Sequence, residues 1–139
     1  MSQTITPYLL YEDGAGALEW LSRAFGFDEV LRFTGDEGYV THAEMRLGGA
    51  SIYMGDPGEQ YKNPKRLGQE TVGIYVLVDD VDAHYDRAKA AGAAILAEPA
   101  DQDYGDRRYT ARDPEGHHWY FAHHIGDVGA AEAGATVSA

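Results

Sequence analysis

Apolar and polar residues follow strand and helix periods in turn along the first part of the chain. Residues 4–11 are apolar and aromatic, which favours a strand, and residues 16–25 place apolar side chains on one helical face. Gly26 follows, where a helix C-terminal glycine is expected. Further strands are predicted at 27–33, 39–47 and 50–55, and Gly48-Gly49 between the last two is a two-residue hairpin signal. The predicted order is β-α-β-β-β.

The same order begins again after residues 56–69, a stretch whose Pro, Gly and Asn residues are typical of a linker. The pattern predicts a strand at 72–78, a helix ending near residue 91 and a short strand from 94 that ends at Pro99. Two more strands, 107–112 and 117–123, flank the turn at 113–116. The halves superpose at an offset of about 66 residues, which indicates an internal repeat.

This pattern predicts an α+β fold in one structural domain. It consists of two β-α-β-β-β modules that share a core. Residues 1–56 are expected to form the first module, 57–70 a linker, 71–124 the second module and 125–139 a flexible tail.

Composition limits the possible chemistry. The 139 residues are 44% hydrophobic, enough for a sizeable core, and contain no cysteine, which excludes disulfides, thiolate zinc sites and thiol nucleophiles. A formal net charge of −12 disfavours nucleic acid and anionic membranes as partners and favours cationic ligands. No apolar run could span a bilayer, and the N-terminus lacks a signal-peptide pattern, so we expect a cytoplasmic protein.

Three motifs carry a family resemblance. They are Tyr104-Gly105-Asp106-Arg107, Asp113-Pro114-Glu115-Gly116-His117-His118-Trp119 and Phe121-Ala122-His123-His124. With the repeated module, they make residues 4–124 resemble the vicinal oxygen chelate superfamily of glyoxalase I, bleomycin-resistance proteins and extradiol dioxygenases. The motifs are similar to those of the branch named for phosphonate-operon gene B. The resemblance implies that the paired β-α-β-β-β modules form a cupped mixed sheet with the helices outside, and that the protein is a homodimer with two equivalent grooves.

Some of these motif residues have a structural interpretation. Asp113 can bond the backbone two residues on, Pro114 fixes φ, and Gly116 can take a positive φ. Asp106 and Arg107 are expected to hold their loop through a charge-assisted hydrogen bond, with an anion clamp at Arg107 as the alternative.

The resemblance also implies where a metal would bind in metal-dependent members. The ligands come from the first and last strands of each module, and here those positions hold Thr6, Tyr53, Gly73 and Tyr120. None of these is a competent ligand for zinc, iron or manganese. We therefore expect no metal and no other cofactor.

Strand alternation identifies other residues of the cup. If Tyr53 faces it, then His42, Glu44 and Arg46 do so too. Although His42 and Glu44 resemble half a metal site, Arg46 argues against a cation there and offers Glu44 an ion-pair partner. His118 can face the cup beside Tyr120, so a displaced site of His42, Glu44 and His118 remains an alternative.

The expected ligand-binding surface is aromatic. Tyrosine rings supply flat area for stacking and a hydroxyl that orients a ligand. The candidate ligand-binding residues are Tyr8, His42, Glu44, Arg46, Tyr53, Tyr75, Tyr109, His118 and Tyr120. His84 is expected to be exposed on the second helix, and Leu31 to lie outside the groove.

These residues favour a metal-independent protein that binds an aromatic or cationic natural product, as in antibiotic resistance. No catalytic residue is predicted, because no nucleophile-and-base arrangement is visible. The alternatives are a lyase, isomerase or dioxygenase with a displaced metal, and a domain without a ligand whose tyrosines only fill space.

Overall fold

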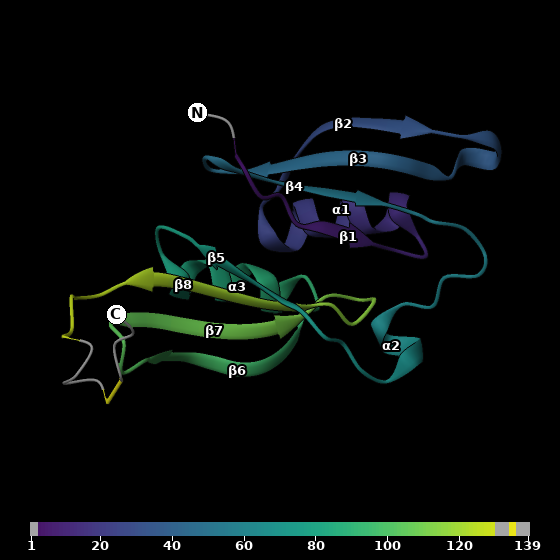
Figure 1. Cartoon of the computed structure of the whole chain (residues 1–139). Helices are drawn as coiled ribbons and strands as arrows, with labels where there is room; N and C mark the ends of the chain where they lie inside the picture. Colours follow the sequence, from purple (N-terminus) through teal and green to yellow (C-terminus); the bar gives the residue numbers. More distant parts are fainter. Residues whose placement is uncertain (1–2, 130–133, 136–139) are drawn as a thin grey trace.

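The computed structural model describes residues 3–129 and 134–135 and contains the repeated module twice (Figure 1). Module 1 comprises β1 (Tyr8–Leu10), α1 (Gly14–Phe25), β2 (Asp28–Thr34), the short 3-10 helix η1 (Asp36–Gly38), β3 (Val40–Leu47) and β4 (Ala50–Gly55). The linker contains α2 (Pro64–Leu67). Module 2 comprises β5 (Gly73–Leu77), α3 (Val81–Ala90), β6 (Ala94–Asp101), β7 (Asp106–Arg112) and β8 (His118–His124).

Each module forms a four-stranded mixed sheet. The strand orders are β1-β4-β3-β2 and β5-β8-β7-β6, so the two sheets have the same topology. The first strand pairs in parallel with the last, and the other pairs are antiparallel. The predicted α+β fold is confirmed.

The helices join the two modules into one core. Helix α1 packs on β2 and β3, α3 packs on β6, β7 and β8, and the two helices contact each other. Phe25, at the end of α1, lies with its ring centroid 5.4 Å from that of Trp119 and 4.6 Å from that of Phe121. The buried core cluster also includes Met45 and Met54 of module 1, so one core lies between the helices and both sheets.

Local sequence signals account for the ends of α1 and for the β3–β4 hairpin. The Asp13 side chain accepts a hydrogen bond from the Gly16 amide at 3.0 Å, and Gly26 ends the helix with φ 81°. Leu47 pairs with Ala50 across Gly48-Gly49, as predicted. This hairpin fixes which residues of β3 and β4 share a face.

A buried polar network ties module 2 to module 1. The Asp113 carboxylate accepts hydrogen bonds from the Tyr11 hydroxyl at 2.6 Å and from the Trp119 indole at 3.1 Å. It also accepts the Glu115 amide, two residues on, at 3.1 Å, and Gly116 has φ 93°, both as expected for this motif. The buried Glu115 carboxylate binds the backbone amides of Glu12 and Asp13.

Two strands differ from the prediction. Strand β1 is shorter than the predicted 4–11, and β6 does not end at Pro99 but continues to Asp101. Proline is tolerated there because β6 is an edge strand whose register shifts between Ala97 and Ala100.

The segment that follows β8 is only partly described. Of the tail expected at 125–139, residues 130–133 and 136–139 lie outside the described residues. The Ile125 amide donates to the Gly105 carbonyl at 2.8 Å. In the described part of the chain, no helix has the length and apolar character to cross a membrane.

Candidate functional site

Each sheet has one face against the helices and one open face. Because successive strand residues point to opposite sides, the strand register decides which residues share the open face. The module 1 open face contains Tyr8, Leu31, Phe33, His42, Glu44, Arg46, Ser51 and Tyr53. The module 2 open face contains Gly73, Tyr75, Leu77, Ala94, Ala97, Ala100, Asp106, Arg108, Thr110, Arg112, His118 and Tyr120.

On the module 1 open face, four predicted residues come together. The Tyr8 hydroxyl lies 2.9 Å from His42 Nδ1, and His42 Nε2 lies 3.8 Å from the Glu44 carboxylate. The Tyr53 ring stands edge-on to both Tyr8 and His42, at centroid distances of 6.0 and 5.1 Å. When the imidazole carries its proton on Nε2, toward Glu44, its Nδ1 accepts a hydrogen bond from the Tyr8 hydroxyl.

Arg46 shares this face but does not pair with Glu44. The predicted ion pair is wrong because His42 occupies the position beside the Glu44 carboxylate, and the Arg46 side chain is exposed. Because Arg46 does not neutralise it, the partly exposed Glu44 carboxylate can accept a cationic group.

The module 2 open face has the same tyrosine pair with different neighbours. The Tyr75 hydroxyl donates to the Asp106 carboxylate at 2.6 Å and lies 3.2 Å from the Tyr104 hydroxyl. The Tyr75 and Tyr120 rings are nearly parallel, 25° apart, with centroids 6.1 Å apart. Burial, followed by the bond to Asp106, raises the pKa of Tyr75, and that same bond lowers the pKa of Asp106.

Arg108 is a site residue that the sequence interpretation missed. Its guanidinium carbon lies 5.2 Å from the Tyr120 ring centroid, and Nη1 donates to the Tyr104 hydroxyl at 3.0 Å. The signal was present in the strand alternation, since Arg108 is two residues from Thr110, which lies opposite Tyr120.

His118 forms a pair with a linker carboxylate. Its Nδ1 lies 2.9 Å from Glu70 Oε1, while its Nε2 is buried without a hydrogen-bond partner in the described structure. A cavity of about 320 Å³ is lined by both His118 and Tyr8, so residues of the two modules border it.

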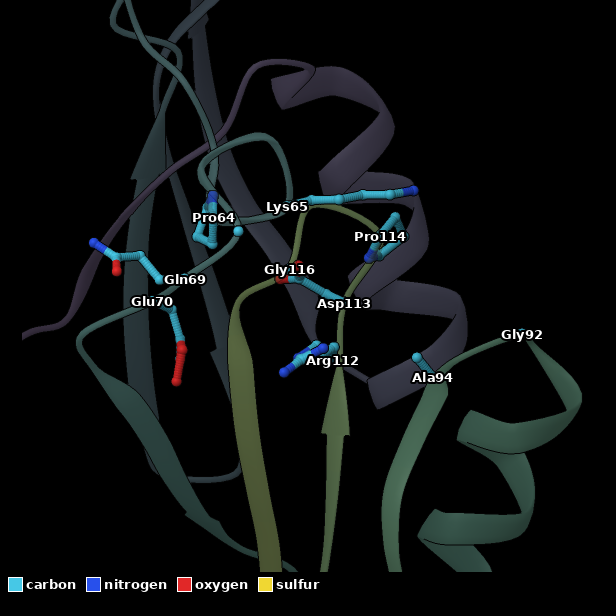
Figure 2. Close-up of a pocket in the computed structure, with 11 residues that line it drawn as sticks. Pro64, Lys65, Gln69, Glu70, Gly92, Ala94, Arg112, Asp113, Pro114 and Gly116 are labelled. Carbon is cyan, nitrogen blue, oxygen red and sulfur yellow. The ribbon is translucent and has the colours of Figure 1, made fainter.

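A second cavity of about 430 Å³ lies at the His118 end of the module 2 open face. Figure 2 shows Glu70 on one side of it and Arg112 on the other, under the linker turn at Pro64 and Lys65. Arg112 lies opposite His118 in the strand register, so the cavity extends the open face beneath the linker.

Tyr109 is not on an open face. Its ring is fully buried and packs on Phe121 at a centroid distance of 5.4 Å, and its hydroxyl lies 2.6 Å from His84 Nδ1. The predicted face was wrong by one residue, because the turn at 113–116 sets Thr110, not Tyr109, opposite Tyr120. A shift of one residue moves a side chain to the other side of a sheet.

Three further expectations are corrected. His84 is half-buried rather than exposed, its Nε2 lies 2.8 Å from the Phe25 carbonyl, and burial lowers its pKa. Arg107 pairs with Asp82 and Asp101, both at 3.0 Å, and not with Asp106. Leu31 lies opposite Glu44 and is therefore on the module 1 open face, not outside it.

The residues at the implied metal positions do not fit a divalent metal. The Tyr120 ring covers Gly73 so closely that a Cβ on Gly73 would lie 2.6 Å from the ring. Within residues 3–129 and 134–135, no three His, Asp or Glu side chains converge as a metal-binding set, so His42, Glu44 and His118 are not assembled into one.

Comparisons with known proteins agree with this fold. A family model described as the glyoxalase/bleomycin-resistance protein/dioxygenase superfamily matches residues 5–121. An uncharacterised protein of Mycobacterium bovis is 34% identical over 139 residues, with 96% of this chain and 91% of the relative covered. An uncharacterised protein of Mycobacterium tuberculosis is also 34% identical, with 96% and 82% covered.

Solved structures show the same similarity. TioX from Micromonospora sp. ML1 is 35% identical, covers 91% of this chain with all of its own length, and superposes with a TM-score of 0.71. A PhnB protein from Bacillus cereus is 20% identical, with 87% of this chain and 99% of that chain covered and a TM-score of 0.63. The similarity to the Bacillus cereus protein shows the fold alone. Membership of the phosphonate-operon branch therefore remains a prediction. The chain belongs to the glyoxalase/bleomycin-resistance protein/dioxygenase superfamily.

Proposed function

We propose that this protein is a metal-independent small-molecule-binding protein of the glyoxalase/bleomycin-resistance type. Its ligand is a planar aromatic or cationic natural product, held on the open faces of the sheets. The observation that carries the proposal is the pair of ordered aromatic surfaces. Tyr8 and Tyr75 remain 49% and 44% exposed, although hydrogen bonds fix both hydroxyls. Exposed rings held in place lose little conformational entropy when a flat ligand stacks on them.

The charge of the chain supports the cationic part of this proposal. The net charge is −12, and Glu44 places a carboxylate among the rings of module 1. A cation beside Tyr8 or Tyr53 gains from the ring faces and from this carboxylate together.

Sequestration of the ligand in the cytoplasm is the proposed role, and it would protect the cell from a toxic natural product. We further propose a homodimer. The open faces expose large apolar side chains, including Phe33 at 60% and Leu77 at 67%, and pairing of two chains would cover them.

A titration followed by tyrosine and tryptophan emission tests the proposal. We expect saturable binding of a planar or cationic antibiotic from a screened panel, unchanged after dialysis against a chelator. The alternative is a lyase, isomerase or dioxygenase with a displaced metal. One zinc, iron or manganese per chain, together with formation of lactoylglutathione from methylglyoxal and glutathione, would favour that alternative.

A further inference from the structure

We propose that the module 2 open face is an anion-selective half of the binding surface, which takes a planar aromatic carboxylate. In this assignment the ring system of the ligand lies against Tyr120 and Arg108 binds the carboxylate, while Arg112 offers a second guanidinium at the other end of the face. The inference rests on the proposed function and specifies the ligand class for one of the two faces.

The first argument is the pairing of arginines on strand β7. The Arg107 side chain points away from the open face and is saturated by Asp82 and Asp101. Arg108 and Arg112 lie on the open face, and neither has a carboxylate within ion-pair distance among the described residues. In a chain with 23 acidic and 11 basic residues, two guanidinium groups without a carboxylate partner are available to an external anion.

The acidic residues of this face are already engaged. The Asp106 carboxylate accepts the Tyr75 hydroxyl at 2.6 Å and contacts His124 at 3.1 Å. The Glu70 carboxylate contacts His118 at 2.9 Å. Neither carboxylate forms an ion pair with Arg108 or Arg112, so both guanidinium groups remain available to an external anion.

The second argument is that Arg108 is held in position. Tyr104 accepts one of its N–H groups at 3.0 Å, and the guanidinium lies over the Tyr120 ring at 5.2 Å. Tyr120 in turn leans over Gly73, where any larger residue would meet the ring at 2.6 Å. A guanidinium already in position loses less conformational freedom when it forms two parallel bonds to a carboxylate.

The third argument is space. On this face β6 contributes the small side chains of Ala94, Ala97 and Ala100, all exposed, so it leaves room for a ligand beside Arg108 and Arg112. The cavity of about 430 Å³ continues it at the Arg112 end. Arg108 and Arg112 are four residues apart on one strand, about 13 Å at the usual rise, with Tyr120 opposite the residue between them. A ring system on Tyr120 therefore has a guanidinium at either end.

The experiment compares 2-naphthoate with 2-naphthamide, which has the same rings and no charge. Both are titrated into the ¹⁵N-labelled full chain, and the amide shifts of each face are followed. We expect 2-naphthoate to shift residues around Thr110 and Tyr120 and to bind about tenfold tighter than the amide, because charge-assisted hydrogen bonds contribute at least that much. The preference should decline at high salt, since exposed charges are screened.

Variants distinguish direct binding by Arg108 from attraction by the overall charge of the protein. Arg108→Gln should reduce the preference for naphthoate to about twofold or less, and Arg108→Lys should restore part of it. Arg23→Gln is the matched control, because it removes the same charge from the exposed side of α1, away from both open faces, and it should leave the preference unchanged. Thermal melting of each variant checks that the fold is retained.

Two results would overturn the inference in different ways. Equal affinity for naphthoate and naphthamide, or naphthoate shifts confined to Glu44 and Tyr53, would reject anion selectivity on module 2 and leave planar-ligand binding intact. No shift with either compound at millimolar concentration would reject the anion site, and failure of the antibiotic panel as well would reject the proposed function.

Discussion

The two open faces share a tyrosine pair and differ in nearly everything around it. Tyr8 lies beside Tyr53 in module 1 as Tyr75 lies beside Tyr120 in module 2. Opposite the second tyrosine, module 1 has Glu44 where module 2 has Thr110. The repeat has therefore kept the stacking surface and changed the charge that accompanies it.

The outer strands show the same divergence. Leu31 and Phe33 of β2 fill the module 1 face, whereas Ala97 and Ala100 occupy the corresponding places of β6. Beside its second tyrosine, module 1 thus has bulky side chains and the Glu44 carboxylate, whereas module 2 has alanines and the Arg108 guanidinium. A duplicated fold can present two ligand chemistries on one backbone geometry, because side chains on an open face are exchanged without disturbing the core.

The largest expected effect comes from disrupting the buried Asp113 hydrogen-bond network that joins the two modules. Asp113→Ala removes the acceptor of the buried Tyr11 hydroxyl and of the Trp119 indole. We expect a loss of about 3–5 kcal/mol in the free energy of unfolding, because buried donors are left unpaired. Urea denaturation measures it, and Asp103→Ala, an exposed acid, is the control. A loss near that of the control would mean that the modules hold together without this network.

The next test compares the tyrosines with ligands of opposite charge. Tyr120→Ala should weaken 2-naphthoate about tenfold and Tyr53→Ala should leave it within about twofold, with the reverse order for 2-naphthylmethylammonium. Isothermal titration calorimetry measures both series. If each variant weakens the binding of both ligands, one ligand contacts both faces. If neither weakens either ligand and melting temperatures fall, the rings serve only as packing.

The residues of these faces were partly predictable. The Gly48-Gly49 hairpin fixes register in module 1 from sequence alone, so His42, Glu44 and Tyr53 were correctly placed together. The corresponding turn at 113–116 is longer and fixes register less tightly, so Tyr109 was assigned to the wrong face. Arg108 was missed for the same reason.

Other features depend on contacts that a single sequence does not encode locally. The pairing of Arg107 with Asp82, or of His118 with Glu70, joins residues from different elements. The fold itself was predictable because hydrophobic periods, the helix-ending Gly26 and the internal repeat all agree.

A smaller effect concerns His84, which joins α3 to the end of α1. Burial lowers its pKa from the ordinary value of 6.5, so the unfolded chain binds the proton more readily. The stability contributed by the neutral imidazole is therefore present above 6.5 and is lost as pH falls below it. Urea denaturation at several pH values should show this loss, and His84→Gln should reduce it. An unchanged pH dependence in the variant would assign the loss to other groups.

The smallest effect separates the first tyrosines of the two faces. Tyr75→Phe removes a hydrogen bond to a carboxylate, and Tyr8→Phe removes one to an imidazole. Both side chains are about half-exposed, so each loss in the free energy of unfolding should be within about 1 kcal/mol. The larger loss is expected at Tyr75 because its bond is charge-assisted.

The Tyr75 bond is also the main cause of the low pKa of Asp106. In Tyr75→Phe the pKa of Asp106 should therefore rise toward its ordinary value of 3.8, and a carboxyl ¹³C titration measures the change. Tyr8→Phe, on the other face, should leave Asp106 unchanged. Equal pKa values for Asp106 in the two variants would mean that His124, rather than Tyr75, keeps this carboxylate ionised, and that Tyr75 is freer to contact a ligand than its hydrogen bond implies.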